Sequence, residues 1–192
     1  MEVNKQTILQ APNGVNKVLL HTCCAPCSVA IIESMMNNGI EPTIFFCNPN
    51  IYPQAEYEKR KTEIIRYAKG LELNFIDADY SHEDWLKETQ HLKEQPERGE
   101  RCQVCFNLRL NETARYAQQN DFEVFATTLG SSRWKDLEQI DTAGQQAAKL
   151  YPNLIFWNEN WRKNGLSNRQ ADLIKEYDFY RQQYCGCEFS KK

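Results

Sequence analysis

The chain has 192 residues, and its 23 Lys and Arg against 26 Asp and Glu give a formal net charge of −3. One domain of this length can bury a core without disulfide support. The small negative charge excludes a nucleic-acid binder that relies on bulk electrostatic attraction. Apolar residues make up 41% of the chain without an unbroken run of 18, which argues against disorder, a collagen-like fibre and a membrane protein.

Strands and helices are predicted to alternate along the chain. Short apolar runs predict strands at residues 18–20, 43–47, 73–76, 122–129 and 154–157. Amphipathic spacing predicts helices at residues 29–38, 53–69, 81–94, 102–119, 136–150 and 168–181. This order predicts an α/β fold, a single Rossmann-like domain whose mostly parallel sheet is covered by helices. We expect an N-terminal extension at residues 1–17 and one domain at residues 18–190.

Three loops follow predicted strands, at residues 22–28, 48–50 and 130–132. Sites in open parallel sheets gather where the strands end at their carboxyl side. We therefore expect these three loops to face one crevice, in which His21, Asn48, Asn50 and Ser132 are candidates to donate a proton or orient a sugar.

Cysteine is the unusual residue of this chain, with eight copies. The first twenty residues lack the apolar core of a signal peptide, so we expect a cytoplasmic protein in which structural disulfides are rare. Seven of the cysteines fall into three short groups, which are Cys23, Cys24 and Cys27; Cys102 and Cys105; and Cys185 and Cys187. Cys47 lies alone in an apolar strand and is interpreted as packing.

The grouped cysteines predict a metal centre. Cys102 and Cys105 lie three residues apart at the start of a predicted helix, where thiolates share one face and the positive end of the helix dipole. Four thiolates from two such places can hold zinc or a 4Fe–4S cluster. The adjacent Cys23 and Cys24 favour the cluster, because they are awkward ligands for one small tetrahedral ion. For Cys185 and Cys187, a strained disulfide, metal binding and a structural role all remain open.

A further signal comes from motifs that follow one another over nearly the whole chain. They are His21-Thr22-Cys23-Cys24-Ala25-Pro26-Cys27; Asn48-Pro49-Asn50-Ile51-Tyr52-Pro53 with Glu56, Tyr57 and Arg60; Arg101-Cys102 to Cys105 with Arg109 and Leu110; Thr127-Thr128-Leu129 with Ser132 and Lys135; and Tyr180-Arg181-Gln182 with Tyr184 to Cys187 and Ser190. Together they resemble the epoxyqueuosine reductase QueH family.

The resemblance implies an iron–sulfur oxidoreductase of tRNA processing that needs no cobalamin. Such an enzyme converts epoxyqueuosine to queuosine at the tRNA wobble position, the last step of queuosine biosynthesis, with electrons from an unidentified donor. The implied fold is that of the adenine-nucleotide α-hydrolase and PP-loop group. Cysteines replace the phosphate loop of the ATP-using members in the turn at residues 22–28, which argues against ATP use.

Two ligand arrangements follow from this resemblance. In the first, Cys23, Cys24, Cys102 and Cys105 hold a 4Fe–4S cluster, while Cys185 and Cys187 form a catalytic redox pair. In the second, Cys27 replaces Cys23 in the cluster, and Cys23 binds a separate mononuclear iron together with a C-terminal cysteine. That iron would polarise the epoxide oxygen.

The tRNA partner is predicted from clusters of aromatic and basic residues. They are Tyr52 and Tyr57 with Lys59-Arg60-Lys61, Arg98 with Arg101, Arg133-Trp134-Lys135, and Trp161-Arg162-Lys163. Two other classes of protein fit the cysteines. One is a zinc-stabilised RNA-binding module, and the other is a thiol–disulfide oxidoreductase that uses Cys102 and Cys105 as its dithiol.

Overall fold

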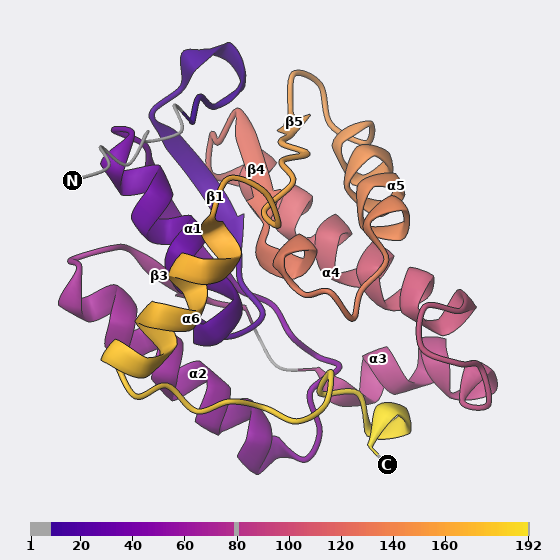
Figure 1. The fold of residues 1–192 in the computed structure, drawn as a ribbon. Coiled ribbons are helices and arrows are strands. Elements are labelled where there is room, and N and C mark those ends of the chain that lie inside the picture. Colours follow the sequence, from indigo (N-terminus) through magenta and orange to yellow (C-terminus); the bar gives the residue numbers. More distant parts are fainter. Residues whose placement is uncertain (1–8, 79–80, 192) are drawn as a thin grey trace.

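A computed structural model describes residues 9–78 and 81–191, so part of the expected N-terminal extension lies outside the described residues. Five strands form one sheet in the order β3-β2-β1-β4-β5, with every neighbouring pair parallel (Figure 1). Their bounds are β1, Lys17–His21; β2, Glu41–Phe46; β3, Phe75–Asp77; β4, Val124–Thr127; and β5, Ile155–Phe156. The predicted α/β class and parallel sheet are confirmed.

Helices cover both faces of this sheet. Their bounds are α1, Ala25–Asn37; α2, Gln54–Gly70; α3, His82–Thr89; α4, Glu100–Gln119; α5, Leu137–Ala148; and α6, Leu166–Glu176. Residues of α1, α2 and α6 pack against one face of the sheet, and residues of α4 and α5 pack against the other face. Because successive side chains of a strand point to opposite faces, Leu20 enters the first core and Leu19 the second. Burial on both faces explains why the strands are continuous apolar runs.

Helix α1 begins four residues earlier than its apolar spacing predicts. Pro26 stands in its first turn, where the missing N–H of proline costs no hydrogen bond. Cys24 is therefore the residue before the helix, and Cys27 lies inside the first turn rather than in a loop. Helix α6 ends at Glu176, five residues earlier than predicted, and Asp178 then takes a positive φ of 50°.

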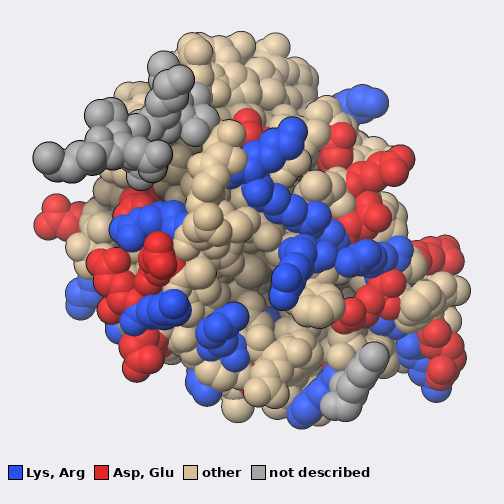
Figure 2. Space-filling model, in the orientation of Figure 1, with Lys and Arg blue, Asp and Glu red and all other residues tan. Residues whose placement is uncertain are grey.

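No helix in the described part of the chain is long and apolar enough to cross a membrane. Acidic and basic side chains share the surface seen in Figure 2, in keeping with the small net charge. Lys and Arg nevertheless gather in a band on one side of this face (Figure 2).

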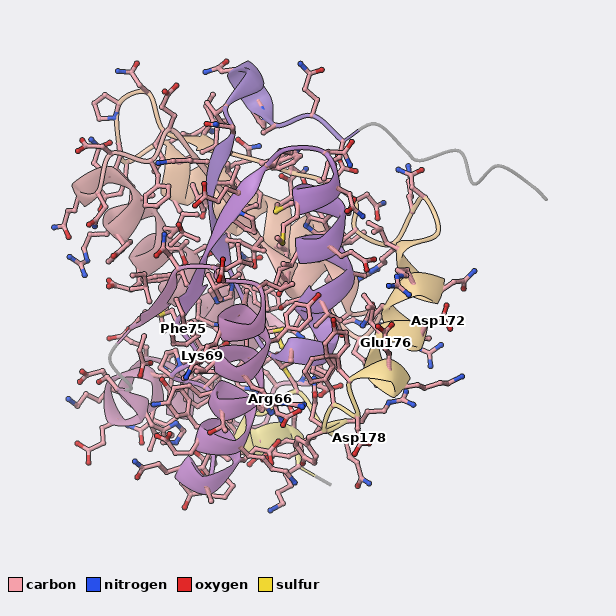
Figure 3. All side chains as sticks on the ribbon, turned by 90° about the vertical axis from the view of Figure 1, so that its left-hand side faces the viewer. Arg66, Lys69, Phe75, Asp172, Glu176 and Asp178 are labelled. Carbon is pink, nitrogen blue, oxygen red and sulfur yellow. The ribbon has the colours of Figure 1, made fainter. Side chains whose placement is uncertain are left out.

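The chain beyond α6 crosses over α2 and ends near α3 (Figure 1). Figure 3 views this junction, with Arg66 on α2 and Asp178 just after α6. Arg66 donates a 3.0 Å hydrogen bond to the Tyr177 carbonyl, and its guanidinium lies 5.1 Å from the ring centre of Phe179. The tail therefore starts from a fixed point on α2.

Candidate metal and active site

The first group of cysteines is buried where β1 passes into α1. The sulfurs of Cys23, Cys24 and Cys27 all lie within 4.8 Å of one another. Within residues 9–78 and 81–191, this is the only group of three or more His, Cys, Asp or Glu side chains that lie close enough together to bind one metal ion. Soft thiolates of this kind select zinc, copper(I) and iron–sulfur clusters.

The segments that follow β1, β2 and β4 meet at this group, but the third contact comes from Thr128, which is predicted to lie in a strand and follows β4 in the structure. The Cys23 N–H donates to the Thr128 hydroxyl at 3.4 Å, and the Ser28 hydroxyl donates to the same oxygen at 3.1 Å. In the second loop, the Asn48 side chain donates to the Thr22 carbonyl at 2.9 Å. The hydrogen bonds thus connect the loops after β1, β2 and β4 at the carboxyl edge of the sheet.

Electrostatics within the group favour one thiolate. Interactions with the thiols of Cys24 and Cys27 hold the pKa of Cys23 well below its ordinary value. The interaction with Cys23 raises the pKa of Cys24, and it raises the pKa of Cys27 to about 12. Burial lowers the pKa of Lys135, but nearby Cys185, Cys23 and Cys27 outweigh burial and raise it above the usual range. A lysine cation thus faces thiols from the first group and from the C-terminal tail.

The second group lies in the first two turns of α4. Cys102 packs against the apolar cluster that contains the first group, and its sulfur accepts a 3.3 Å hydrogen bond from the Arg98 N–H. Burial raises the pKa of Cys102 to about 11. Cys105 packs instead with Trp85 and Cys187, and burial raises its pKa as well. The start of helix α4 therefore contacts both the cluster of the first cysteine group and the tail.

The third group is held in place by α2 and the loop before it. Buried Arg60 donates to the carbonyl of Cys185 at 3.1 Å, and the Tyr52 N–H donates to the carbonyl of Gly186 at 2.9 Å. Burial raises the pKa of Cys187 to about 11. All eight cysteines are free thiols in this structure, and Cys47 is buried, as its apolar surroundings predict.

Two residues of the site are not among the predicted site residues. Buried Arg109 donates to the Cys47 carbonyl at 3.2 Å and also bonds the Asn48 side chain. The signal for Arg109 is its spacing, because it follows Cys102 by seven residues and so shares its helix face. Gln182 places its side-chain nitrogen 2.9 Å from the sulfur of Cys24. No local sequence pattern connects Gln182 with Cys24, because the two residues are 158 positions apart in the chain.

His21 joins three strands and has no ring nitrogen left for a substrate. Its Nε2 lies 3.0 Å from the Cys47 carbonyl, which only accepts, so this nitrogen carries the proton. Its Nδ1 accepts from the Thr127 hydroxyl at 2.7 Å. Burial, helped by the Arg109 cation, lowers the pKa of His21 to about 3. The neutral ring therefore does not serve as the proton donor that its position after a strand suggests.

Replacing His21 with alanine is expected to lower the free energy of unfolding by about 2–4 kcal/mol, through two lost buried hydrogen bonds and a cavity. Urea unfolding followed by circular dichroism under anaerobic conditions measures the change. His91→Ala is the matched control, because His91 is exposed. Equal stability of the two variants would contradict the structural role of His21.

Several predicted RNA-contacting residues are buried and unavailable to a base. Tyr57 donates to Asp77, and the Trp161 ring N–H donates to the Thr127 carbonyl at 2.9 Å. Arg60 is bound to the tail, as described above, and Arg101 donates to the Lys93 carbonyl at 2.8 Å. Their rings and charges hold the fold together. The residues of these clusters that are exposed are Tyr52, Lys59, Arg98, Arg133, Trp134 and Lys163.

Comparison with known proteins gives a consistent result. A family model described as epoxyqueuosine reductase QueH matches residues 18–192. A Haemophilus influenzae protein named epoxyqueuosine reductase QueH is 48% identical over 182 residues, which cover 95% of this chain and 74% of that protein. Proteins with the same name from Acinetobacter baylyi and Thermotoga maritima are 46% and 36% identical, over 95% and 90% of this chain and over 84% and 89% of their own lengths.

Proposed function

This chain belongs to the epoxyqueuosine reductase QueH family, and from this premise we propose that it reduces epoxyqueuosine to queuosine at the wobble position of tRNA. In this reaction both C–O bonds of the epoxide break and the two carbons form a double bond. The oxygen leaves as water after the uptake of two electrons and two protons. The observation that carries the proposal is the buried thiol group of Cys23, Cys24 and Cys27, whose neighbour Lys135 also interacts with Cys185 of the tail.

The residues at this edge of the sheet fit an iron–sulfur cofactor. Their donors are soft thiolates, and Lys135 and Arg109 supply positive charge beside Cys23. Three buried polar atoms of the described site lack a hydrogen-bond partner, namely Thr22 Oγ1, Asn50 Oδ1 and Gln182 Oε1. Such atoms are ordinarily satisfied, which supports a site built to receive a further group. A 4Fe–4S cluster held there would pass electrons one at a time.

The chain's own residues prepare the site for this group. Thr128 holds the backbone of Cys23 in place through its hydroxyl. Arg109 holds the Asn48 loop against α4, and Gln182 brings the tail against Cys24. Apolar residues pack around all three cysteines of the first group and limit the access of water.

In the first of two arrangements, Cys23, Cys24, Cys102 and Cys105 hold the cluster; in the second, Cys27 takes the place of Cys23. Anaerobic reconstitution of two matched variants, Cys23→Ala and Cys27→Ala, separates them by counting iron and sulfide per chain. The first arrangement predicts a lost cluster in Cys23→Ala and a full one in Cys27→Ala. The second predicts the reverse for the cluster, together with the loss of one additional iron from Cys23→Ala.

Cys185 and Cys187 are proposed as the redox pair of the first arrangement. Oxidation of two thiols to a disulfide releases two electrons and two protons, which is the requirement of epoxide reduction, and an external electron donor then restores the thiols. The free state of both thiols and the glycine between them support this role. In the second arrangement one of these thiols binds the separate iron with Cys23, and the shared proximity of Cys23 and Cys185 to Lys135 supports that alternative.

The proposed activity is tested directly with tRNA that carries epoxyqueuosine. The anaerobically reconstituted protein, reduced with dithionite, is expected to convert the modified nucleoside to queuosine, which nucleoside mass spectrometry detects as the loss of one oxygen. The protein should be brown, with absorbance near 400 nm that bleaches on reduction. A colourless zinc protein that binds the tRNA without converting it would contradict the proposal.

A further inference from the structure

We propose that Trp134 is a stacking platform for a base of the anticodon loop next to the reacting nucleotide, an inference that rests on the proposed function. Trp134 is 66% exposed, whereas the other three tryptophans of the chain are buried. Unpaired RNA bases are commonly held by stacking on such rings. The exposed ring therefore suits a ligand with a flat aromatic face.

The ring is presented by a loop that arginines hold from two sides. Arg98 donates to the Trp134 carbonyl at 3.1 Å and to the Arg133 carbonyl at 2.9 Å. Arg162 donates to the carbonyls of Gly130 at 2.8 Å and Lys135 at 2.7 Å. Because the backbone is fixed before a ligand arrives, binding to this ring loses little conformational entropy.

The same loop connects the ring to the cysteines. Cys185, Cys23 and Cys27 are near enough to raise the pKa of Lys135, the next residue in the chain, and consecutive Cα atoms are only about 3.8 Å apart. Arg98 makes the second connection, since its N–H donates to the sulfur of Cys102 while its side chain holds Trp134. A base on Trp134 would therefore be a close neighbour of a nucleotide at the proposed metal centre.

The charge around the ring matches RNA. The guanidinium of Arg133 lies 5.6 Å from the Trp134 ring centre. Further positive charge comes from Arg98 and Arg162, which hold the loop, and from Lys163, which follows Arg162 in the segment after β5. The band of Lys and Arg in Figure 2 lies on this side of the molecule, below β5 in the view of Figure 1. Phosphates beside a stacked base would meet these cations.

The test compares Trp134→Ala, Trp134→Phe and the wild type in binding a fluorescent anticodon stem-loop RNA, measured by anisotropy without oxygen. Loss of one stacked base is expected to raise Kd about 5- to 100-fold in Trp134→Ala, and Trp134→Phe should restore most of the affinity. Leu150→Ala is the matched control, because Leu150 is also an exposed apolar side chain, at 62%. Its Kd should equal that of the wild type.

RNAs that lack one base at a time identify the stacked position. Removal of the base that stacks on Trp134 should weaken the wild type but leave Trp134→Ala unchanged, so that the two effects are not additive. With epoxyqueuosine-containing RNA and dithionite, Trp134→Ala should raise KM while kcat stays near that of the wild type.

Two results would overturn this inference while the proposed function stands. One is a Trp134→Ala variant whose Kd and KM equal those of the wild type and which still converts the RNA. The other is unchanged RNA binding with activity lost only when a protein electron donor replaces dithionite, which would make the ring a protein-docking site. Failure of the wild type to convert the RNA would instead contradict the proposed function, and anisotropy would still report whether Trp134 binds a base.

Discussion

Cys105→Ala is expected to lose its iron and sulfide together with its reductase activity. Cys105 is a cluster ligand in both proposed arrangements, and it lies on α4, which packs with the cluster of the first cysteine group and with Cys187 of the tail. Loss of a ligand should lower activity by at least about 100-fold, because even the outer partners of metal ligands typically cost 10- to 100-fold when replaced. Iron and sulfide analysis, absorbance near 400 nm and nucleoside mass spectrometry measure the three changes.

Cys47→Ala is the control for this substitution. Cys47 is as buried as Cys105, at 5% exposed against 7%, and lies near the same Arg109. Its thiol serves packing in our interpretation, so this variant should keep its iron, its sulfide and its activity. A Cys105→Ala protein with full iron and sulfide would contradict both arrangements, and an iron-free Cys47→Ala would show that the eighth cysteine is a ligand.

The fold could be predicted because its strands are buried on both faces. Neighbouring residues such as Leu19 and Leu20 enter different cores, so each strand reads as a short apolar run with a helix-length segment after it. The start of α1 could not be placed from apolar spacing, because its first turn is fixed by Pro26 and covers cysteines instead of large aliphatic residues. Cys27 therefore lies in a helix, whereas the sequence pattern predicts it in a loop.

The close group of Cys23, Cys24 and Cys27 was predictable from cysteine spacing, but its supports were not. Short spacing shows which thiols share a turn or a helix face, whereas the hydrogen bonds of Gln182 to Cys24 and of Arg60 to the tail join residues more than a hundred positions apart. The local sequence pattern also does not show which aromatic side chains are buried. Tyr57 and Trp161 look like RNA-contacting rings beside charged neighbours, yet both lie in the core.

Gly186→Ala is expected to abolish most of the reductase activity while it leaves the first cysteine group in place. Gly186 has a φ of 110°, and an added Cβ would lie 2.9 Å from Ile51 and 3.0 Å from the guanidinium of Arg60. That guanidinium holds the carbonyl of Cys185, so the substitution should displace both tail cysteines. A shift of about 1 Å in reacting groups can cost about 100-fold in rate.

Gly39→Ala separates this effect from backbone strain. Gly39 has a φ of 74° with no atom within 4 Å of the added Cβ, and it follows α1 away from the cysteines. Both variants should lose about 1–3 kcal/mol of stability from the unfavourable φ, but Gly39→Ala should keep its activity. In the first arrangement Gly186→Ala keeps four irons, and in the second it loses the separate iron. Wild-type activity in Gly186→Ala, at the same loss of stability, would remove the tail cysteines from the mechanism.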